Sequence, residues 1–129
     1  MKISKLTDYS MVILSEMKEN QLLSAKKISE ITHVPLATTN KVLRLLTKAN
    51  ICFSKGGKTG GFGLLIALNK ISLLHVVESI EGQTPAFTTC ITDNECKIQT
   101  HCKISKKMLT IDTEINNVLA NKFISDFLK

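Results

Sequence analysis

The chain has 129 residues, enough for one domain with a real hydrophobic core, and a formal net charge of +6 at pH 7. The charge favours an anionic partner such as nucleic acid, although sixteen of the seventeen basic side chains are lysines. Residues 1–10 lack the apolar core of a signal peptide, and the longest apolar run, residues 64–68, is too short to cross a bilayer. We therefore expect a cytoplasmic protein with no membrane partner, whose thiols stay reduced.

The first 50 residues show three helical patterns in the order of a helix-turn-helix. Apolar side chains recur at helical spacing over residues 5–19, and Asn20 is the expected stop. Ser24 can cap a second helix over residues 25–31, and a short turn follows it. Pro35 suits the first position of a third helix, which should end near Ala49.

The third predicted helix carries a basic face. At roughly 100° per residue, its polar and basic side chains gather on the side opposite its apolar ones. A charged face exposed to solvent is the simplest interpretation, as on any surface helix. If the helix instead enters a DNA groove, the candidate contacts are Thr38, Asn40, Lys41, Arg44 and Lys48.

Residues 51–68 predict a β-hairpin, because two β-prone runs enclose a loop with four glycines and two lysines. A hairpin directly after a helix-turn-helix is a wing. Lys55, Lys58 and Gly60 are its candidate DNA contacts, since glycine lets the backbone approach phosphate closely. An ordinary glycine-rich turn is the alternative. Gly-Lys-Thr at 57–59 lacks the earlier glycine of a nucleotide-binding loop and does not open a helix, so nucleotide binding is set aside.

Two further apolar patterns follow the hairpin. The first predicts a helix over residues 71–80, ended by Gly82. The second, over residues 104–128, repeats at three- to five-residue steps for about five turns. Intramolecular packing could bury this stripe. A long helix projecting from so small a module would instead expose it, and we favour pairing between two protomers.

These elements predict a mainly α fold with a small β-hairpin. We divide it into a winged helix-turn-helix DNA-binding domain over residues 1–82, a cysteine-rich cluster-binding loop over 83–103, and a dimerisation helix over 104–129.

Cys90, Cys96 and Cys102 form a C-x5-C-x5-C array in the polar segment before the last helix. Their spacing is wider than that of paired zinc-finger ligands, and iron–sulfur clusters are held mainly by cysteine thiolates. An iron–sulfur cluster is therefore favoured over zinc. Cys52 lies in an apolar stretch, where we expect a small buried hydrophobe without a role.

Five segments, in this order, resemble the winged-helix iron–sulfur regulators that include IscR, NsrR and the proteobacterial regulators of the Suf cluster-assembly operon. They are KISKLTDYSMVIL, SAKKISEITHVPLATTNKVLRLLTKANI, GGF, ISLLHVVESIEG and the cysteine array. The opening looks closest to the Suf-operon regulators. The resemblance implies a homodimer that binds double-stranded DNA at a palindromic promoter site and holds one cluster per protomer. It implies a cluster-sensing regulator, not an enzyme, that represses iron–sulfur assembly genes, with [2Fe-2S] favoured over [4Fe-4S].

The chain departs from this family in the fourth cluster ligand. Family members resembling IscR supply a histidine where this chain has Ser105, a weak ligand. His101 is one replacement, although a solvent-facing histidine is an equal interpretation. Asp8 is the other, because it matches a carboxylate that members resembling NsrR supply from the partner subunit; otherwise it is a helix N-terminal residue facing the macrodipole. Gly56 replaces the usual arginine of the wing, and Phe62 the usual tyrosine.

Two alternatives to cluster sensing remain. One is a winged-helix DNA-binding protein stabilised by zinc and without a sensing role, which would need a fourth strong ligand. The other is a repressor of other genes that senses nitric oxide or redox state.

Overall fold

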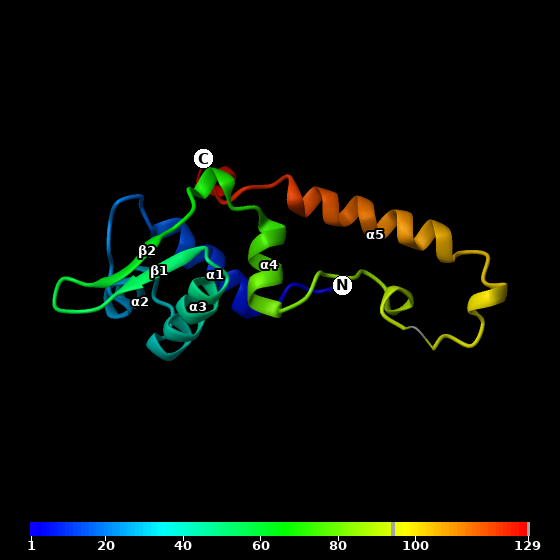
Figure 1. Cartoon of the computed structure of the whole chain (residues 1–129), viewed down its shortest axis with the longest axis horizontal. Coiled ribbons are helices and arrows are strands. Elements are labelled where there is room, and N and C mark those ends of the chain that lie inside the picture. Colours follow the sequence, from blue (N-terminus) through cyan, green and yellow to red (C-terminus); the bar gives the residue numbers. More distant parts are fainter. Residues whose placement is uncertain (94, 129) are drawn as a thin grey trace.

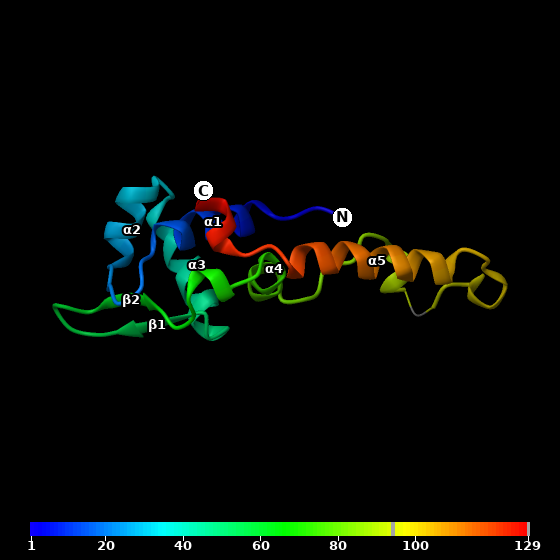
Figure 2. The same cartoon turned by 90° about the horizontal axis from the view of Figure 1, so that it is seen from above.

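The computed structural model describes residues 1–93 and 95–128. A winged-helix body lies at one end, and an arm formed by the last long helix and the cysteine loop projects from it (Figures 1 and 2). In the described ranges the chain forms α1 (Lys5–Glu16), α2 (Ala25–Thr32), α3 (Leu36–Lys48), β1 (Cys52–Lys55), β2 (Gly61–Leu64), α4 (Leu73–Glu81) and α5 (Ser105–Ala120). Short 3-10 turns are η1 (Leu68–Lys70), η2 (Thr89–Ile91), η3 (Gln99–His101) and η4 (Ile124–Leu128).

Serine side chains begin three of these helices. Ser24 Oγ accepts from the backbone N–H of Lys27 at 3.0 Å, which confirms the predicted cap of α2, and Ser4 and Ser72 act alike on α1 and α4. Such caps satisfy N–H groups that the helix itself leaves unpaired. Gly82 ends α4 at φ 77°, as predicted.

Pro35 is the N-cap of α3, which begins at Leu36, and not the first helical residue as predicted. Two other helix ends in the winged-helix body differ from the sequence prediction by two or three residues. The first helix ends at Glu16, because the backbone of Met17 is extended, and the Met17 side chain is 2% exposed. The fourth begins at Leu73, two residues after the predicted start, because Ser72 forms its cap and Ile71 is buried before it. In both cases a core side chain lies just outside the helix, where helical periodicity alone would include it.

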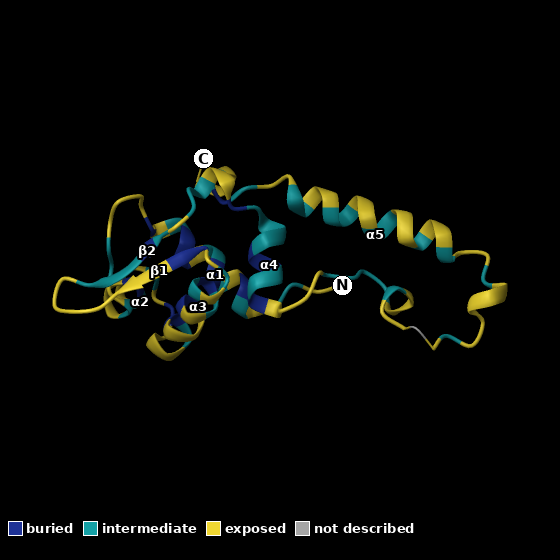
Figure 3. Ribbon diagram, in the orientation of Figure 1, coloured by how far each residue is buried: buried dark blue, intermediate teal, exposed yellow. Residues whose placement is uncertain are grey.

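The core is built around α3. Its side chains Val42, Leu43 and Leu46 are fully buried in one cluster with residues of α1, α2 and β1. Burying each such side chain contributes about 1.5–3 kcal/mol. The opposite face of α3 is exposed, as the sequence predicts (Figure 3).

The predicted hairpin is confirmed as an antiparallel pair, with Cys52 opposite Leu64 and Lys55 opposite Gly61. A further bridge attaches it to the body: the N–H of Phe62 donates to Leu23 O at 2.8 Å, and the N–H of Leu23 donates to Phe62 O at 3.0 Å. These bonds fix the wing beside the helix-turn-helix.

The prediction that the apolar stripe over residues 104–128 forms one helix is wrong. Helix α5 ends at Ala120, and the chain then returns to the body, where Ile124 is fully buried. The N–H of Leu73 donates to Lys122 O at 2.7 Å, and the N–H of Ile124 to Ile71 O at 2.9 Å. These bonds join segments far apart in sequence, so helical spacing could not reveal them. No helix in the described ranges is long and apolar enough to span a membrane.

Cys52 is fully buried, and burial raises the pKa of its thiol from the ordinary 9.0 to about 12. Above about pH 9 the unfolded chain therefore loses this proton while the folded chain keeps it, so the free energy of unfolding should fall as pH rises. The expected slope is up to about 1.4 kcal/mol per pH unit. Urea unfolding between about pH 9 and 11 measures it. A Cys52→Ala variant should lack this component; an unchanged pH slope would contradict the prediction.

Candidate DNA interface and thiol site

The candidate DNA-contacting face combines α3 with the wing. Asn40, Lys41, Arg44 and Lys48 are exposed, and Thr38 is half-buried. The wing tip extends from the same winged-helix body, and Lys55 and Lys58 on it are exposed (Figure 1). A basic helix face and a basic hairpin tip on one body have the composition that binding to DNA phosphates requires.

Leu36 is a further candidate contact, which the sequence interpretation did not consider because it looked only for polar and basic side chains. It is the first residue of α3 and is 45% exposed. Steps of four residues separate Leu36, Asn40 and Arg44, so the three form one stripe along the helix. Apolar side chains in a major groove contact thymine methyl groups. A helical projection that marked exposed apolar residues could have found it.

Gly60 has a structural explanation. A Cβ atom at this position would collide with the backbone carbonyl groups of Lys55 and Gly56 across the turn. The turn therefore requires glycine at residue 60 whether or not its backbone meets phosphate. A DNA contact by Gly60 stays a prediction.

The three loop cysteines are brought together. Cys90 lies in η2, Cys102 follows η3, and Cys96 lies between them; all three line one pocket of about 230 Å³. Cys90 is exposed, and the other two are half-buried. The pocket is completed by Ile91, Asp93, Gln99, Ser105 and Leu109.

The donor chemistry of this pocket fits a soft metal centre, but its spacing does not fit a single ion. Three thiols converge on it, and thiolates select iron–sulfur clusters, zinc and copper(I). Nowhere in residues 1–93 and 95–128 do three cysteine, histidine or carboxylate groups lie close enough to hold one ion. The pocket therefore supplies the thiol donors of a soft metal centre, but the described residues do not gather them around one ion.

Asp93 is a second residue that the sequence interpretation missed. It lines the thiol pocket, and its Oδ1 accepts from the backbone N–H of Glu95 at 3.0 Å. Its position three residues after Cys90 was the available signal. His101 is exposed and does not line the pocket, whereas Ser105 does.

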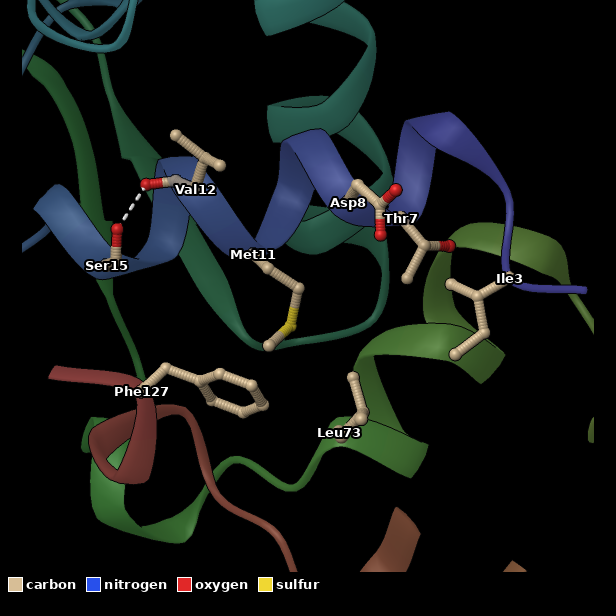
Figure 4. Close-up of a pocket in the computed structure, with 8 residues that line it drawn as sticks. All are labelled: Ile3, Thr7, Asp8, Met11, Val12, Ser15, Leu73 and Phe127. Atoms are coloured by element: carbon tan, nitrogen blue, oxygen red, sulfur yellow. Dashed lines mark hydrogen bonds between the residues drawn. The ribbon is translucent and has the colours of Figure 1, made fainter.

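Asp8 lies on α1 in the winged-helix body and not among the thiols of its own chain. It lines an apolar groove of about 430 Å³, together with Ile3, Thr7, Met11, Val12, Ser15, Leu73 and Phe127. In Figure 4, Met11 points toward Phe127 across this groove, and Leu73 lies beside them. A role for Asp8 in the metal site therefore requires a second subunit, as the sequence interpretation assumed, and stays a prediction.

Comparison with known proteins agrees with this architecture. The chain is 24% identical over 110 residues to the HTH-type transcriptional regulator YwgB of Bacillus subtilis, covering 84% of this chain and 70% of YwgB. It is 25% identical over 118 residues to the HTH-type transcriptional regulator YffB of Lactococcus lactis, covering 88% of this chain and 76% of YffB.

Solved structures share the fold. CymR, the global cysteine regulator of B. subtilis, superposes with a TM-score of 0.74 at 19% identity, covering 98% of this chain and 95% of CymR. IscR of T. potens superposes with a TM-score of 0.68 at 20% identity, covering 99% of this chain and 86% of IscR. The family model described as "Rrf2: Iron-dependent Transcriptional regulator" matches residues 3–129. This chain therefore belongs to the Rrf2 family of transcriptional regulators.

Proposed function

We propose that this protein is a homodimeric, DNA-binding repressor whose loop thiols hold an iron–sulfur cluster, [2Fe-2S] in preference to [4Fe-4S]. Iron–sulfur assembly genes are the proposed target. The observation that carries the proposal is the convergence of Cys90, Cys96 and Cys102 on one pocket, attached to a winged-helix body. The family description, an iron-dependent regulator, supports it.

The cluster, when bound, would supply a centre that is lost or altered when iron becomes scarce or oxidants appear. The chain contributes three thiolates and a small loop that closes around them. Among the described residues 88–93 and 95–104, the backbone hydrogen bonds are local, such as the one from Asp93 N–H to Thr89 O at 2.9 Å. A loop held mainly by local bonds can be ordered further when a ligand joins its three thiols.

A path of direct contacts connects this loop with the helix-turn-helix. Thr84, at the start of the loop, donates to Glu78 Oε2 on α4 at 2.6 Å. One turn further along α4, Glu81 Oε2 accepts from Thr7 Oγ1 of α1 at 2.9 Å. A change in the loop can thus shift α4 against α1. Coupling of this kind is typically about 1–3 kcal/mol, or roughly 5- to 150-fold in operator affinity.

Two apolar surfaces support the homodimer. Helix α5 has no buried residue in the single chain, and its Leu109 and Val118 are more than half exposed. The groove beside Asp8 is the other surface, where Phe127 is 57% exposed. A two-fold pairing that lays the arm of one protomer on the body of the other would cover both surfaces and would bring Asp8 toward the partner's thiol loop.

A second candidate function is redox sensing by the thiols alone. Structural similarity to Staphylococcus aureus CymR in an oxidized form, with a TM-score of 0.65, favours it. The exposure of Cys90 would allow oxidants to reach it. The zinc-stabilised alternative is less favoured, because the described pocket does not gather ligands around one ion.

The cluster proposal is tested by anaerobic purification, or by reconstitution with iron and sulfide. The wild type should show visible charge-transfer absorption with stoichiometric iron and sulfide, and Cys90→Ala, Cys96→Ala or Cys102→Ala should remove it, because only these thiols converge. Cys52→Ala is the matched control and should keep its colour. A colourless wild type with oxidant-dependent DNA binding would support the thiol-redox candidate, and a stoichiometric zinc content the zinc one.

The fourth ligand is tested by three single variants. If Asp8 of the partner completes the site, Asp8→Ala should accelerate cluster loss to a chelator while the dimer persists in analytical ultracentrifugation. Asp93→Ala should have that effect if the carboxylate in the thiol pocket is the ligand. His101→Ala should have little effect, because His101 lies outside the pocket; a large effect there would reassign the role to histidine.

DNA reading is tested with a promoter fragment whose half-sites lie about 10 bp apart, as two recognition helices related by a dyad require. Arg44→Ala should weaken specific binding by about 1–3 kcal/mol and relax sequence preference, because Arg44 can bind guanine with two hydrogen bonds. Lys58→Ala should weaken specific and scrambled duplexes similarly and reduce the salt slope by about one.

Lys122→Ala is the matched control for charge alone. The Lys122 side chain is exposed on the segment after α5, and the backbone carbonyl that receives the Leu73 hydrogen bond is retained. Titrations of both duplexes at several salt concentrations separate the effects. If Arg44→Ala and Lys58→Ala bind like Lys122→Ala, the basic face of α3 is only a solvated surface.

A further inference from the structure

One face of α5 supports the cysteine loop along its length. Ser105 and Leu109, in the first turns of the helix, line the thiol pocket. Asp112 and Asn116 follow at steps of three and four residues, so all four side chains lie on one side of the helix. The last two contact residues 85–87, the segment that leads to Cys90.

Three hydrogen bonds attach this segment to α5. The backbone N–H of Phe87 donates to Asp112 Oδ1 at 3.1 Å. Asn116 Nδ2 donates to the backbone carbonyl of Pro85 at 3.1 Å and to Asp112 Oδ2 at 3.2 Å. The Asp112 carboxylate and the Asn116 amide thus bind one backbone donor and one backbone acceptor of residues 85–87. We call these two side chains the α5 clamp.

The clamp has only one satisfactory arrangement. Both partners of Asn116 Nδ2 are acceptors, so rotating the amide by half a turn would set its oxygen against two other oxygens. Asn116 Oδ1 is buried and has no hydrogen-bond partner among the described residues. The unpaired oxygen costs free energy, which the two bonds donated by Nδ2 offset.

Helix α5 also contacts the chain close to two of the three thiols. Cys102 lies three residues before α5 begins, so the N-terminus of this helix positions it. Cys90 lies three residues after Phe87, in η2, which packs on α5. One rigid helix therefore positions both ends of the array. Cys96, between them, is held in the described part of the loop by a local bond, from Gln99 N–H to Cys96 O at 3.3 Å.

We propose that Asp112 and Asn116 are positioning residues for Cys90: by clamping residues 85–87 to α5, they hold this thiol at the pocket that it lines together with Cys102. The purpose of that placement rests on the proposed cluster function, but the placement itself does not require a cluster. The fixed thiols Cys90 and Cys102 form a preorganised pair, and Cys96 binds to the same ligand after them.

The test uses the full-length, reduced, metal-free protein and four variants. Asp112→Ala and Asn116→Ala remove the clamp. Asp112→Asn keeps an oxygen acceptor for the Phe87 N–H and should rescue part of the effect. Glu114→Ala, which removes an exposed carboxylate from the same helix, is the matched control.

Two measurements report on how residues 85–87 and the Cys90 thiol are held. Hydrogen exchange at the Phe87 N–H should be roughly tenfold faster in Asp112→Ala, with no change in α3 and little change in Glu114→Ala. Phenylarsine oxide joins two neighbouring thiols, and mass spectrometry identifies the pair. The wild type should give adducts that include Cys90, and the clamp variants should shift toward the Cys96–Cys102 adduct.

The result also separates the clamp from the cluster proposal. Unchanged Phe87 exchange, an unchanged adduct distribution, or equal effects in Glu114→Ala would overturn the clamp, even if the wild type assembles a cluster. If the wild type assembles no cluster but the clamp variants still show the shift in adducts, the clamp is retained and cluster sensing is rejected. If all amides exchange faster and the unfolding temperature falls with them, Asp112 is a general stability residue and the positioning role is wrong.

Discussion

The burial of one side of α3 is the constraint on which the rest of the structure depends. Val42, Leu43 and Leu46 are fully buried, so the helix cannot rotate without exposing them to water at a cost of about 1.5–3 kcal/mol each. Its basic side is then the side that faces solvent. The same core holds α1 and β1 around α3, and the wing is attached to it through the paired backbone bonds of Leu23 and Phe62.

The four cysteines show how environment separates residues of one type. Cys52 is buried in the core, and the raised pKa of its thiol keeps it protonated and chemically inert near neutral pH. Cys90, Cys96 and Cys102 line an open pocket on the arm, away from the core. A soft ligand or an oxidant can therefore reach the loop thiols, while the core thiol contributes only to packing.

Helix α5 connects the functions proposed for the arm. Its exposed apolar residues offer a surface to a second protomer, and its Asp112 and Asn116 hold the beginning of the cysteine loop. A helix that serves both purposes would transmit a change in the loop directly to the dimer. The contact of Glu81 with Thr7 offers a parallel route to the helix-turn-helix within one chain.

The sequence by itself determined the local elements, because their causes are local. Ser24 caps α2, Gly82 ends α4, and the spacing of apolar residues in α3 predicts which face is buried. The grouping of three thiols in one loop was also visible. Only the tertiary structure decided where α5 ends, because the return of the chain to the core depends on backbone bonds from Ile124 to Ile71 and from Leu73 to Lys122. It likewise placed Asp93 and Ser105 at the thiols, left His101 outside the pocket, and brought Asp112 to Phe87, 25 residues away. Such contacts arise from packing between distant segments, and no periodicity in the sequence encodes them.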